Sequence, residues 1–278
     1  MPAEAQPFPT PRKTARAALP ERRADRLGAQ TLKAYAALKD AILQGELPPA
    51  TRLSEMAMVQ RLGVSRTPAR MAMMRLREEG IVEPVRSGGF AVRGFSEADV
   101  LAAIEIRATL EGLASRFAAE RRLSAAQLAP LRDCVLAIGR LVEQAKGPST
   151  DGPATYVALN DEFHSLLSDL AACPPLSRQL ERASALPFAS PSGLVLARAK
   201  VSDFRTMLIV AHDQHQGIVE AIQSHDGTRA ENLTREHTRL ASRNLARVLC
   251  SPDALALVPG SALIVVEPAD RAAIAARP

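Results

Sequence analysis

Four residues at the start of one predicted helix have side chains suited to contacts with nucleic acid. Arg66 and Arg70 are four residues apart, so both lie on one face of a helix that opens at Ser65. A guanidinium can donate to both O6 and N7 of guanine, which discriminates against other bases by about 1–3 kcal/mol. Ser65 and Thr67 add hydroxyls at the helix N-terminus, where backbone N–H groups also favour a phosphate. The spacing favours contact with DNA, although an exposed helix with solvated arginines has the same pattern.

A glycine pair further along the chain predicts the tip of a β-hairpin. Residues 81–86 and 89–93 form the two strands, and Gly88-Gly89 lets the turn approach a sugar-phosphate backbone closely. Arg86 and Arg93 flank this tip and could contact phosphates. Two short helices followed by such a hairpin are the layout of a winged helix-turn-helix, which reads a DNA major groove.

Histidines form the second set of residues with recognisable chemistry. Asn160 and His164 are four residues apart on one predicted helix, while His215 and His237 belong to the last two predicted helices. Three helices can bring one amide oxygen and three imidazole nitrogens together, a ligand set that suits Zn²⁺ or Ni²⁺ with positions left open. His212 is an alternative ligand. Taken singly, each histidine is more simply explained as a core or surface residue.

Helices must position both sets of residues. The chain is 47% hydrophobic but only 3% aromatic, with no Trp, and a core of aliphatic side chains favours packed helices over a β-sandwich. Around the DNA-contacting residues, Gly63 and Gly80 are predicted helix ends, and Met71 and Met74 are predicted apolar positions. Beyond the hairpin only helices are predicted, the last of them over residues 229–250.

The predicted fold class is mainly α, with an N-terminal winged helix-turn-helix followed by an all-α helical bundle. Residues 1–28 hold five prolines and are expected to form a flexible basic arm. The winged helix-turn-helix domain is expected over residues 29–95. An all-helical ligand-binding domain is expected over residues 96–250, and residues 251–278 are expected to form a tail.

Charge is distributed unevenly along the chain. The formal net charge is +3 over residues 1–28, +4 over residues 29–93 and −2 over the remainder. A polyanionic partner for the N-terminal third is consistent with this asymmetry. Three widely spaced cysteines without a CxxC pair indicate free thiols, and no apolar run approaches the length of a membrane helix. A cytoplasmic protein that does not contact membranes is expected.

Residues 30–95 resemble the DNA-binding domain of GntR-type bacterial regulators. The matching stretches begin at Ile42 (ILQGELPP), Arg52 (RLSE), Leu62 (LGVSRTPAR) and Glu79 (EGIV). The resemblance implies that Arg66, Thr67 and Arg70 read the major groove and that Gly88-Gly89 form a wing in the minor groove. Met56 departs from the family, which often has an arginine there that contacts DNA, so a different base preference is expected.

The remainder resembles the all-helical FCD effector domain of the FadR-type branch of this family. The matching stretches begin at Glu105 (EIRATLE), Asn160 (NDEFH), His215 (HQGIVEAI) and Glu236 (EH). The resemblance implies that Asn160, His164, His215 and His237 are metal ligands, with Asn160 where the family often has Asp. It also implies that Arg107 faces the cavity and binds a carboxylate effector. The alternative is that Arg107 simply pairs with Glu111, four residues on.

The expected function is a ligand-responsive transcriptional regulator that binds an operator as a homodimer. Its effector is expected to be a small organic acid held near the metal by Arg107. A metal-dependent enzyme with an appended DNA-binding domain is one alternative, but no HExxH motif or nucleophile beside a base is present, and no catalytic residue is predicted. A DNA-architectural protein without an effector is the other, which the clustered histidines argue against.

Overall fold

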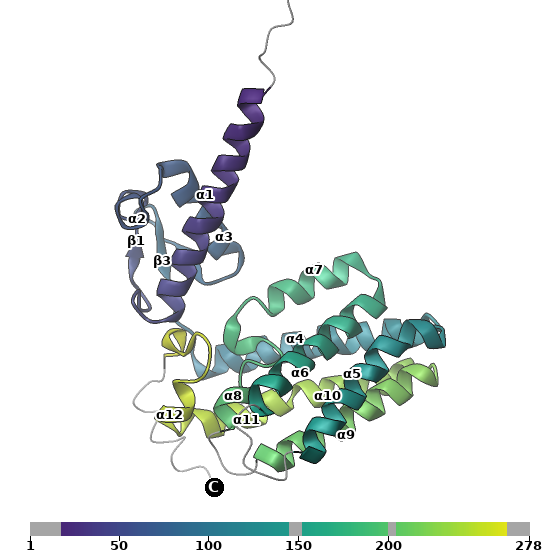
Figure 1. Cartoon of the computed structure of the whole chain (residues 1–278). Helices are drawn as coiled ribbons and strands as arrows, with labels where there is room; N and C mark the ends of the chain where they lie inside the picture. Colours follow the sequence, from purple (N-terminus) through teal and green to yellow (C-terminus); the bar gives the residue numbers. More distant parts are fainter. Residues whose placement is uncertain (1–17, 145–151, 200–203, 266–278) are drawn as a thin grey trace, which may run out of the picture.

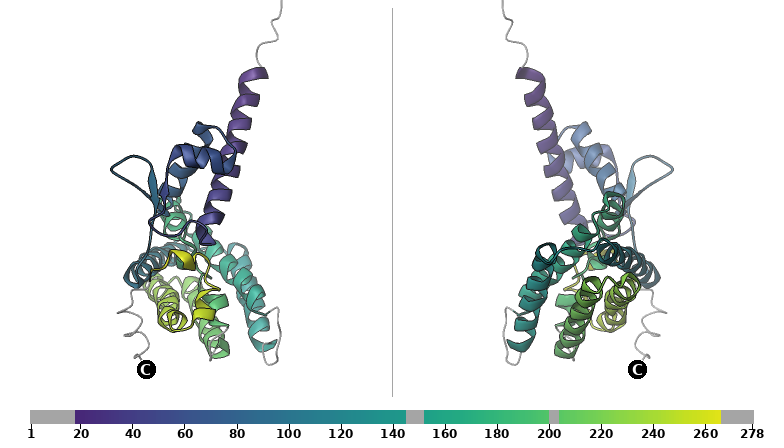
Figure 2. Two further views of the ribbon diagram at one scale, coloured as in Figure 1. Left: turned by 90° about the vertical axis from the view of Figure 1, so that its left-hand side faces the viewer. Right: turned by 90° about the vertical axis from the view of Figure 1, so that its right-hand side faces the viewer.

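A small N-terminal head and a larger helical bundle make up the protein (Figure 1). The computed structural model describes residues 18–144, 152–199 and 204–265. Figure 2 shows the head at one end of the bundle, with its hairpin loop extending away from the first helix. The expected fold class, a winged helix-turn-helix followed by an all-α bundle, is confirmed.

The head is a helix-turn-helix with a three-stranded sheet. Its elements are α1 (Ala18–Leu43), β1 (Arg52–Leu53), α2 (Glu55–Leu62), α3 (Arg66–Glu78), β2 (Val82–Pro84) and β3 (Phe90–Val92). The Ser54 hydroxyl accepts from the N–H of Ala57 at the start of α2, and Gly63 ends that helix at φ 62°. The strands pair antiparallel in the order β1-β3-β2. Strand β1 was not predicted, because two residues are too few to show an alternating pattern.

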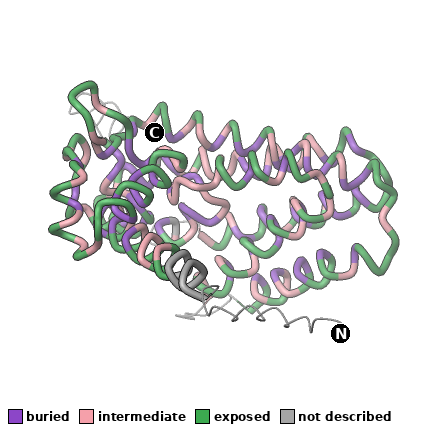
Figure 3. Tube along the Cα trace, turned by 90° about the horizontal axis from the view of Figure 1, so that it is seen from above, coloured by how far each residue is buried: buried purple, intermediate pink, exposed green. Residues whose placement is uncertain are grey.

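The bundle is built around one long central helix. Its elements are α4 (Glu97–Glu120), α5 (Ala125–Gln144), α6 (Gly152–Ala171), α7 (Pro174–Ala183), η1 (Pro187–Ala189), α8 (Val195–Arg198), α9 (Phe204–Gln223), α10 (Gly227–Thr238) and α11 (Leu240–Leu249). Helix α4 packs against α6, α7, α9 and α10, and Figure 3 shows buried positions recurring along the helices of the bundle. A capping box of Ser96 and Asp99 starts α4. A residue on the inner face of α4 can therefore reach several other helices.

Helix α1 begins earlier than the sequence predicted. The expectation of a flexible arm over residues 1–28 is wrong for residues 18–28, which form the first turns of α1. Their Ala, Leu, Glu and Arg are good helix formers, and Pro20 falls in the first turn, where a missing N–H costs little. Residues 1–17 of the predicted arm lie outside the described residues.

Residues 252–265 of the predicted tail fold against the head and the bundle. Two short helices, α12 (Pro252–Leu255) and η2 (Ser261–Leu263), return the chain to the junction between head and bundle (Figure 1). The N–H of Phe95 donates to the carbonyl of Leu263, and the N–H of Val265 donates to the carbonyl of Phe95, each at 2.8 Å. The expectation of a tail is therefore wrong for residues 252–265, because their apolar side chains complete a core. Residues 266–278 lie outside the described residues.

One continuous apolar core joins the head, residues 252–265 and the bundle. It contains Leu38 of α1, Phe188 of η1 and Leu245 of α11 together with Ile264. The rings of Phe95 and Phe188 meet edge to face with centroids 5.1 Å apart. Because the head shares its core with η1 and α11, displacing either of these elements would disturb the packing of the head.

Replacing Ile264 with Asp should destabilise the protein by about 2–4 kcal/mol, since the side chain is only 8% exposed and lies in an apolar cluster. The junction should loosen first, so denaturant unfolding should change from one transition to two. Leu257→Asp is the matched control, because Leu257 is 40% exposed. An Ile264→Asp protein that unfolds with the midpoint and single transition of the control would contradict the shared core.

Candidate functional site

The first candidate site is the outward face of α3. Arg66, Thr67 and Arg70 are exposed, while Ala69 and Met73 on the opposite face are buried in the core. Ser65 occupies the N-cap position, but its hydroxyl makes no cap hydrogen bond and is exposed. All the predicted DNA-contacting side chains of this helix therefore lie on one accessible surface.

The prediction for two methionines of α3 is wrong. Met71 and Met74 are 47% and 42% exposed, and Met73 takes the core position instead. Met74 lies beside Arg70 in a hollow between α3 and the wing. The error arises because three methionines within four residues leave the phase of the helix ambiguous.

The hairpin that follows α3 is held by an arginine whose role was not predicted. Gly88 and Gly89 have φ of 86° and 84°, in the left-handed region that favours glycine. A Cβ on Gly89 would lie 2.7 Å from the carbonyl oxygen of Leu53. Arg52, on β1, donates to the carbonyls of Ser87 and Gly88 at 3.0 and 3.3 Å. The tip is thus tied to β1, and Arg86 remains exposed beside it.

Three histidines meet in the interior of the bundle. His164 of α6, His215 of α9 and His237 of α10 are all buried and each offers a ring nitrogen, all within 4.8 Å of one another. The Nε2 atoms of His215 and His237 are 3.0 Å apart. In a tetrahedral zinc site two ligand nitrogens lie about 3.3 Å apart, because each is about 2.0 Å from the metal. The spacing of these two rings therefore fits a shared metal.

The protonation of these rings also suits a metal. Burial lowers the pKa of His215 well below its usual range, and the rings of His237 and His164 lower it further. Burial likewise lowers the pKa of His237 to about 3. Both imidazoles are therefore neutral near pH 7, as metal coordination requires. Nδ1 of His215 is buried and has no hydrogen-bond partner among the described residues.

A buried carboxylate links the histidines to α4. Glu111 accepts two hydrogen bonds from Nη1 of Arg107, at 2.9 and 3.1 Å, and one from the hydroxyl of Thr238 at 2.6 Å. Its Oε1 is 3.2 Å from Nδ1 of His164. Burial alone would raise the pKa of Glu111, but the charge of Arg107 and the contacts of His164 and Thr238 hold it well below its usual range.

The same contacts explain why the last predicted helix is split. The hydroxyl of Thr238 also lies 3.0 Å from the carbonyl of Thr234, an i−4 contact that bends helices. The predicted single helix over residues 229–250 is accordingly two helices, α10 and α11, which meet at Arg239.

Three further residues were predicted to take part in this site, and the structure places each of them differently. Asn160 lines the same cavity as His164, but its amide Nδ2 donates to the hydroxyl of Ser192 at 3.1 Å. His212 is not part of the histidine cluster, because its ring faces α5 at Gly139. Arg107 pairs with Glu111 and also lines the cavity, so the predicted ion pair and the predicted position at the cavity occur together.

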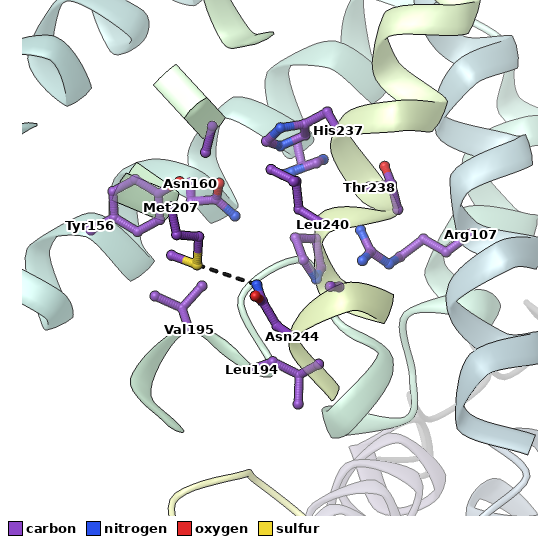
Figure 4. Close-up of a pocket in the computed structure, with 14 residues that line it drawn as sticks. Arg107, Tyr156, Asn160, Leu194, Val195, Met207, His237, Thr238, Leu240 and Asn244 are labelled. Atoms are coloured by element: carbon purple, nitrogen blue, oxygen red, sulfur yellow. Dashed lines mark hydrogen bonds between the residues drawn. The ribbon is translucent and has the colours of Figure 1, made fainter. Parts of the chain in front are cut away.

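The cavity beside the histidines is small. Its volume is about 40 Å³. Arg107, His237 and Thr238 contribute polar groups on one side, and Tyr156 and Asn160 of α6 lie on the other with Met207 and Val195 (Figure 4). Nε of Arg107 is buried without a hydrogen-bond partner among the described residues, which leaves one donor for a bound molecule.

Two protein-family models match successive parts of the chain. The model of the gntR family of bacterial regulatory proteins matches residues 30–92, and the FCD domain model matches residues 102–240. The chain is a member of the GntR family with an FCD effector domain. The FCD match runs from residue 102 within α4 to the end of α10 and includes all three histidines, while residues 241–265 lie beyond it.

Similar sequences are transcriptional regulators. A regulator from the TAR-I ttuE-ttuC' intergenic region of Agrobacterium vitis is 33% identical over half of this chain and 79% of its own length. A probable D-xylose utilization operon repressor from Paenarthrobacter nicotinovorans is 29% identical over 70% of this chain and 80% of its own. The repressor RspR of Escherichia coli is 25% identical over 77% and 88%.

Solved structures agree on the fold. The E. coli McbR/YncC protein is 20% identical and superposes with a TM-score of 0.52 over 79% of this chain and 96% of its own. The Lar protein of Listeria monocytogenes is 17% identical, with a TM-score of 0.55 over 78% and 96%.

This GntR-family protein is a transcriptional regulator that binds operator DNA through its head and a small-molecule effector through its FCD domain. The alternatives of a metal-dependent enzyme and of an effector-independent architectural protein are thereby set aside. Within the described residues, no helix is long and apolar enough to cross a membrane.

Removing the charge of Glu111 should cost about 3–5 kcal/mol of stability, because Arg107 would be left as an unpaired buried charge. Denaturant unfolding of Glu111→Gln measures this loss. Glu120→Gln, which breaks the exposed pair with Arg116, is the matched control and should cost far less. The double variant Arg107→Met/Glu111→Gln should recover part of the loss. Equal stabilities for the Glu111 and Glu120 variants would show that the buried pair has no such role.

Proposed function

We propose that the FCD domain binds a divalent metal, and that a small carboxylate effector completes its coordination and alters DNA binding by the head. The observation that carries this proposal is the group of three buried histidines beside a buried arginine. Zn²⁺ or Ni²⁺ is the metal best suited to imidazole ligands. His164, His215 and His237 would hold it, with Asn160 able to add its amide oxygen from the same cavity wall.

The effector is a small organic acid in this proposal. A metal with an open position accepts a carboxylate oxygen, and the unpartnered Nε of Arg107 supplies a charged hydrogen bond to the same molecule. The 40 Å³ volume of the cavity favours a short acid or a cavity that widens on binding. The net charge near the histidines supports an anion, because Glu111 already balances Arg107 and a metal would add two positive charges.

DNA reading in this proposal falls to α3 and the hairpin. Arg66, Thr67 and Arg70 enter the major groove, with Ser65 at a phosphate. Gly88 and Gly89 bring the wing close to the backbone, and Arg86 contacts phosphate. The protein acts in the cytoplasm as a homodimer, whose two heads read half-sites about one helical turn apart.

Arg66→Ala and Arg70→Ala should each weaken specific DNA binding by about 1–3 kcal/mol, because each removes one guanidinium that donates to a base. Arg86→Ala should instead lower affinity for all sequences and reduce the salt dependence. Affinities for DNA selected by the parent protein, measured over a range of salt concentrations, separate these outcomes. The recognition-helix assignment would fail if the Arg66/Arg70 double variant bound that DNA as tightly as the parent.

Purified protein should contain about one divalent ion per chain, and a chelator should lower its melting temperature because the ion joins three helices. His164→Ala should lose the ion, while His225→Ala should retain it, since His225 is exposed and lies outside the cluster. Elemental analysis and thermal melts of the three proteins provide the measurement. Absence of metal from the parent, together with no shift in its melting temperature on adding Zn²⁺, would refute the metal site.

A further inference from the structure

The cavity borders two hollows on the surface of the FCD domain, because it shares lining residues with each of them. The first, which we call the α9/α11 hollow, has a volume of about 390 Å³ and is lined by residues of these two helices. The second, the α6/α7 hollow, has a volume of about 370 Å³ and shares His164 and Pro191 with the cavity. Each of these hollows offers a route by which an effector can reach the cavity from solution.

Three side chains form the wall between the cavity and the α9/α11 hollow. Met207, Leu240 and Asn244 line both spaces. Nδ2 of Asn244 donates to Sδ of Met207 at 3.3 Å, the contact drawn in Figure 4. A thioether is a weak acceptor on a flexible side chain, so this contact can be exchanged at low cost.

The two hollows differ in charge. The α9/α11 hollow is lined by Arg243 and Arg247 and by no Asp or Glu. Arg243 also pairs with Glu236, on α10. The α6/α7 hollow is lined by Glu111, Asp161, Asp169 and Glu181 and by no Lys or Arg. An anion would therefore be attracted at the first hollow and repelled at the second.

We propose that the α9/α11 hollow is the entrance for the anionic effector and that Met207 and Asn244 form its gate. The proposal rests on the carboxylate effector proposed above. Arg243 and Arg247 raise the local concentration of the acid, the methionine side chain rotates away from Asn244, and the carboxylate moves inward to Arg107. Both gate residues control access to the cavity, whereas the histidines would hold the metal.

The entrance can be tested with ¹³C-labelled acetate and zinc-loaded full-length protein. Titration gives the Kd, and ligand-observed exchange broadening gives the dissociation rate, from which the association rate follows. Arg243→Gln/Arg247→Gln should slow association about tenfold at low salt and flatten its salt dependence. Asp161→Asn/Asp169→Asn is the matched pair at the α6/α7 hollow and should leave association unchanged or slightly faster.

The gate itself is tested at Met207. Met207→Ala should speed both association and dissociation, because it removes most of the side chain between the two spaces, while Met207→Leu, which conserves volume, should keep the rates of the parent. Unchanged rates in both the arginine and Met207→Ala variants, or a Met207→Ala effect confined to the dissociation rate, would overturn the entrance while leaving the carboxylate proposal intact. No binding of acetate or longer monocarboxylates by the parent would refute the carboxylate proposal and the entrance with it.

Discussion

The buried carboxylate of Glu111 is the interaction on which the effector domain depends. It neutralises Arg107 on its own helix, accepts a hydrogen bond from Thr238 on α10 and lies 3.2 Å from the ring of His164 on α6. A charge this deeply buried is tolerated only with such partners, so it constrains three helices at once. The same contacts fix the neighbourhood in which the histidines meet, and the split between α10 and α11 follows from the position of Thr238.

The head is connected to this centre by packing rather than by a flexible linker. Phe95 follows the wing, contacts Phe188 of η1 and hydrogen-bonds with the returning C-terminal segment. Pro191, two residues beyond η1, lines the effector cavity, and α11 contributes both Asn244 to the cavity and Leu245 to the shared core. Effector binding that moves η1 or α11 would therefore change how the head is held, which gives a physical route from cavity to DNA.

Much of the helix-turn-helix, of the hairpin and of the first part of the histidine site was predictable from sequence, because these features depend on local spacing. The Ser65-to-Arg70 motif, the paired glycines and the i,i+4 spacing of Asn160 and His164 each carry their own signal. Long-range contacts leave no such signal in the sequence, which is why residues 252–265, which pair with Phe95, were mistaken for a tail. The role of Arg52 was also missed, because its partners are backbone carbonyls distant in sequence. Resemblance alone indicated that the three histidines converge.

The central claim is that occupancy of the histidine centre controls DNA binding. The most direct measurement is the affinity of the full-length protein for its selected operator, metal-free, zinc-loaded and zinc-loaded with a saturating small carboxylate. The account predicts that the carboxylate changes this affinity at least about tenfold, a coupling of about 1.4 kcal/mol, and that His164→Ala abolishes the change. Equal affinity in all three states, or the same response in His164→Ala, would contradict it.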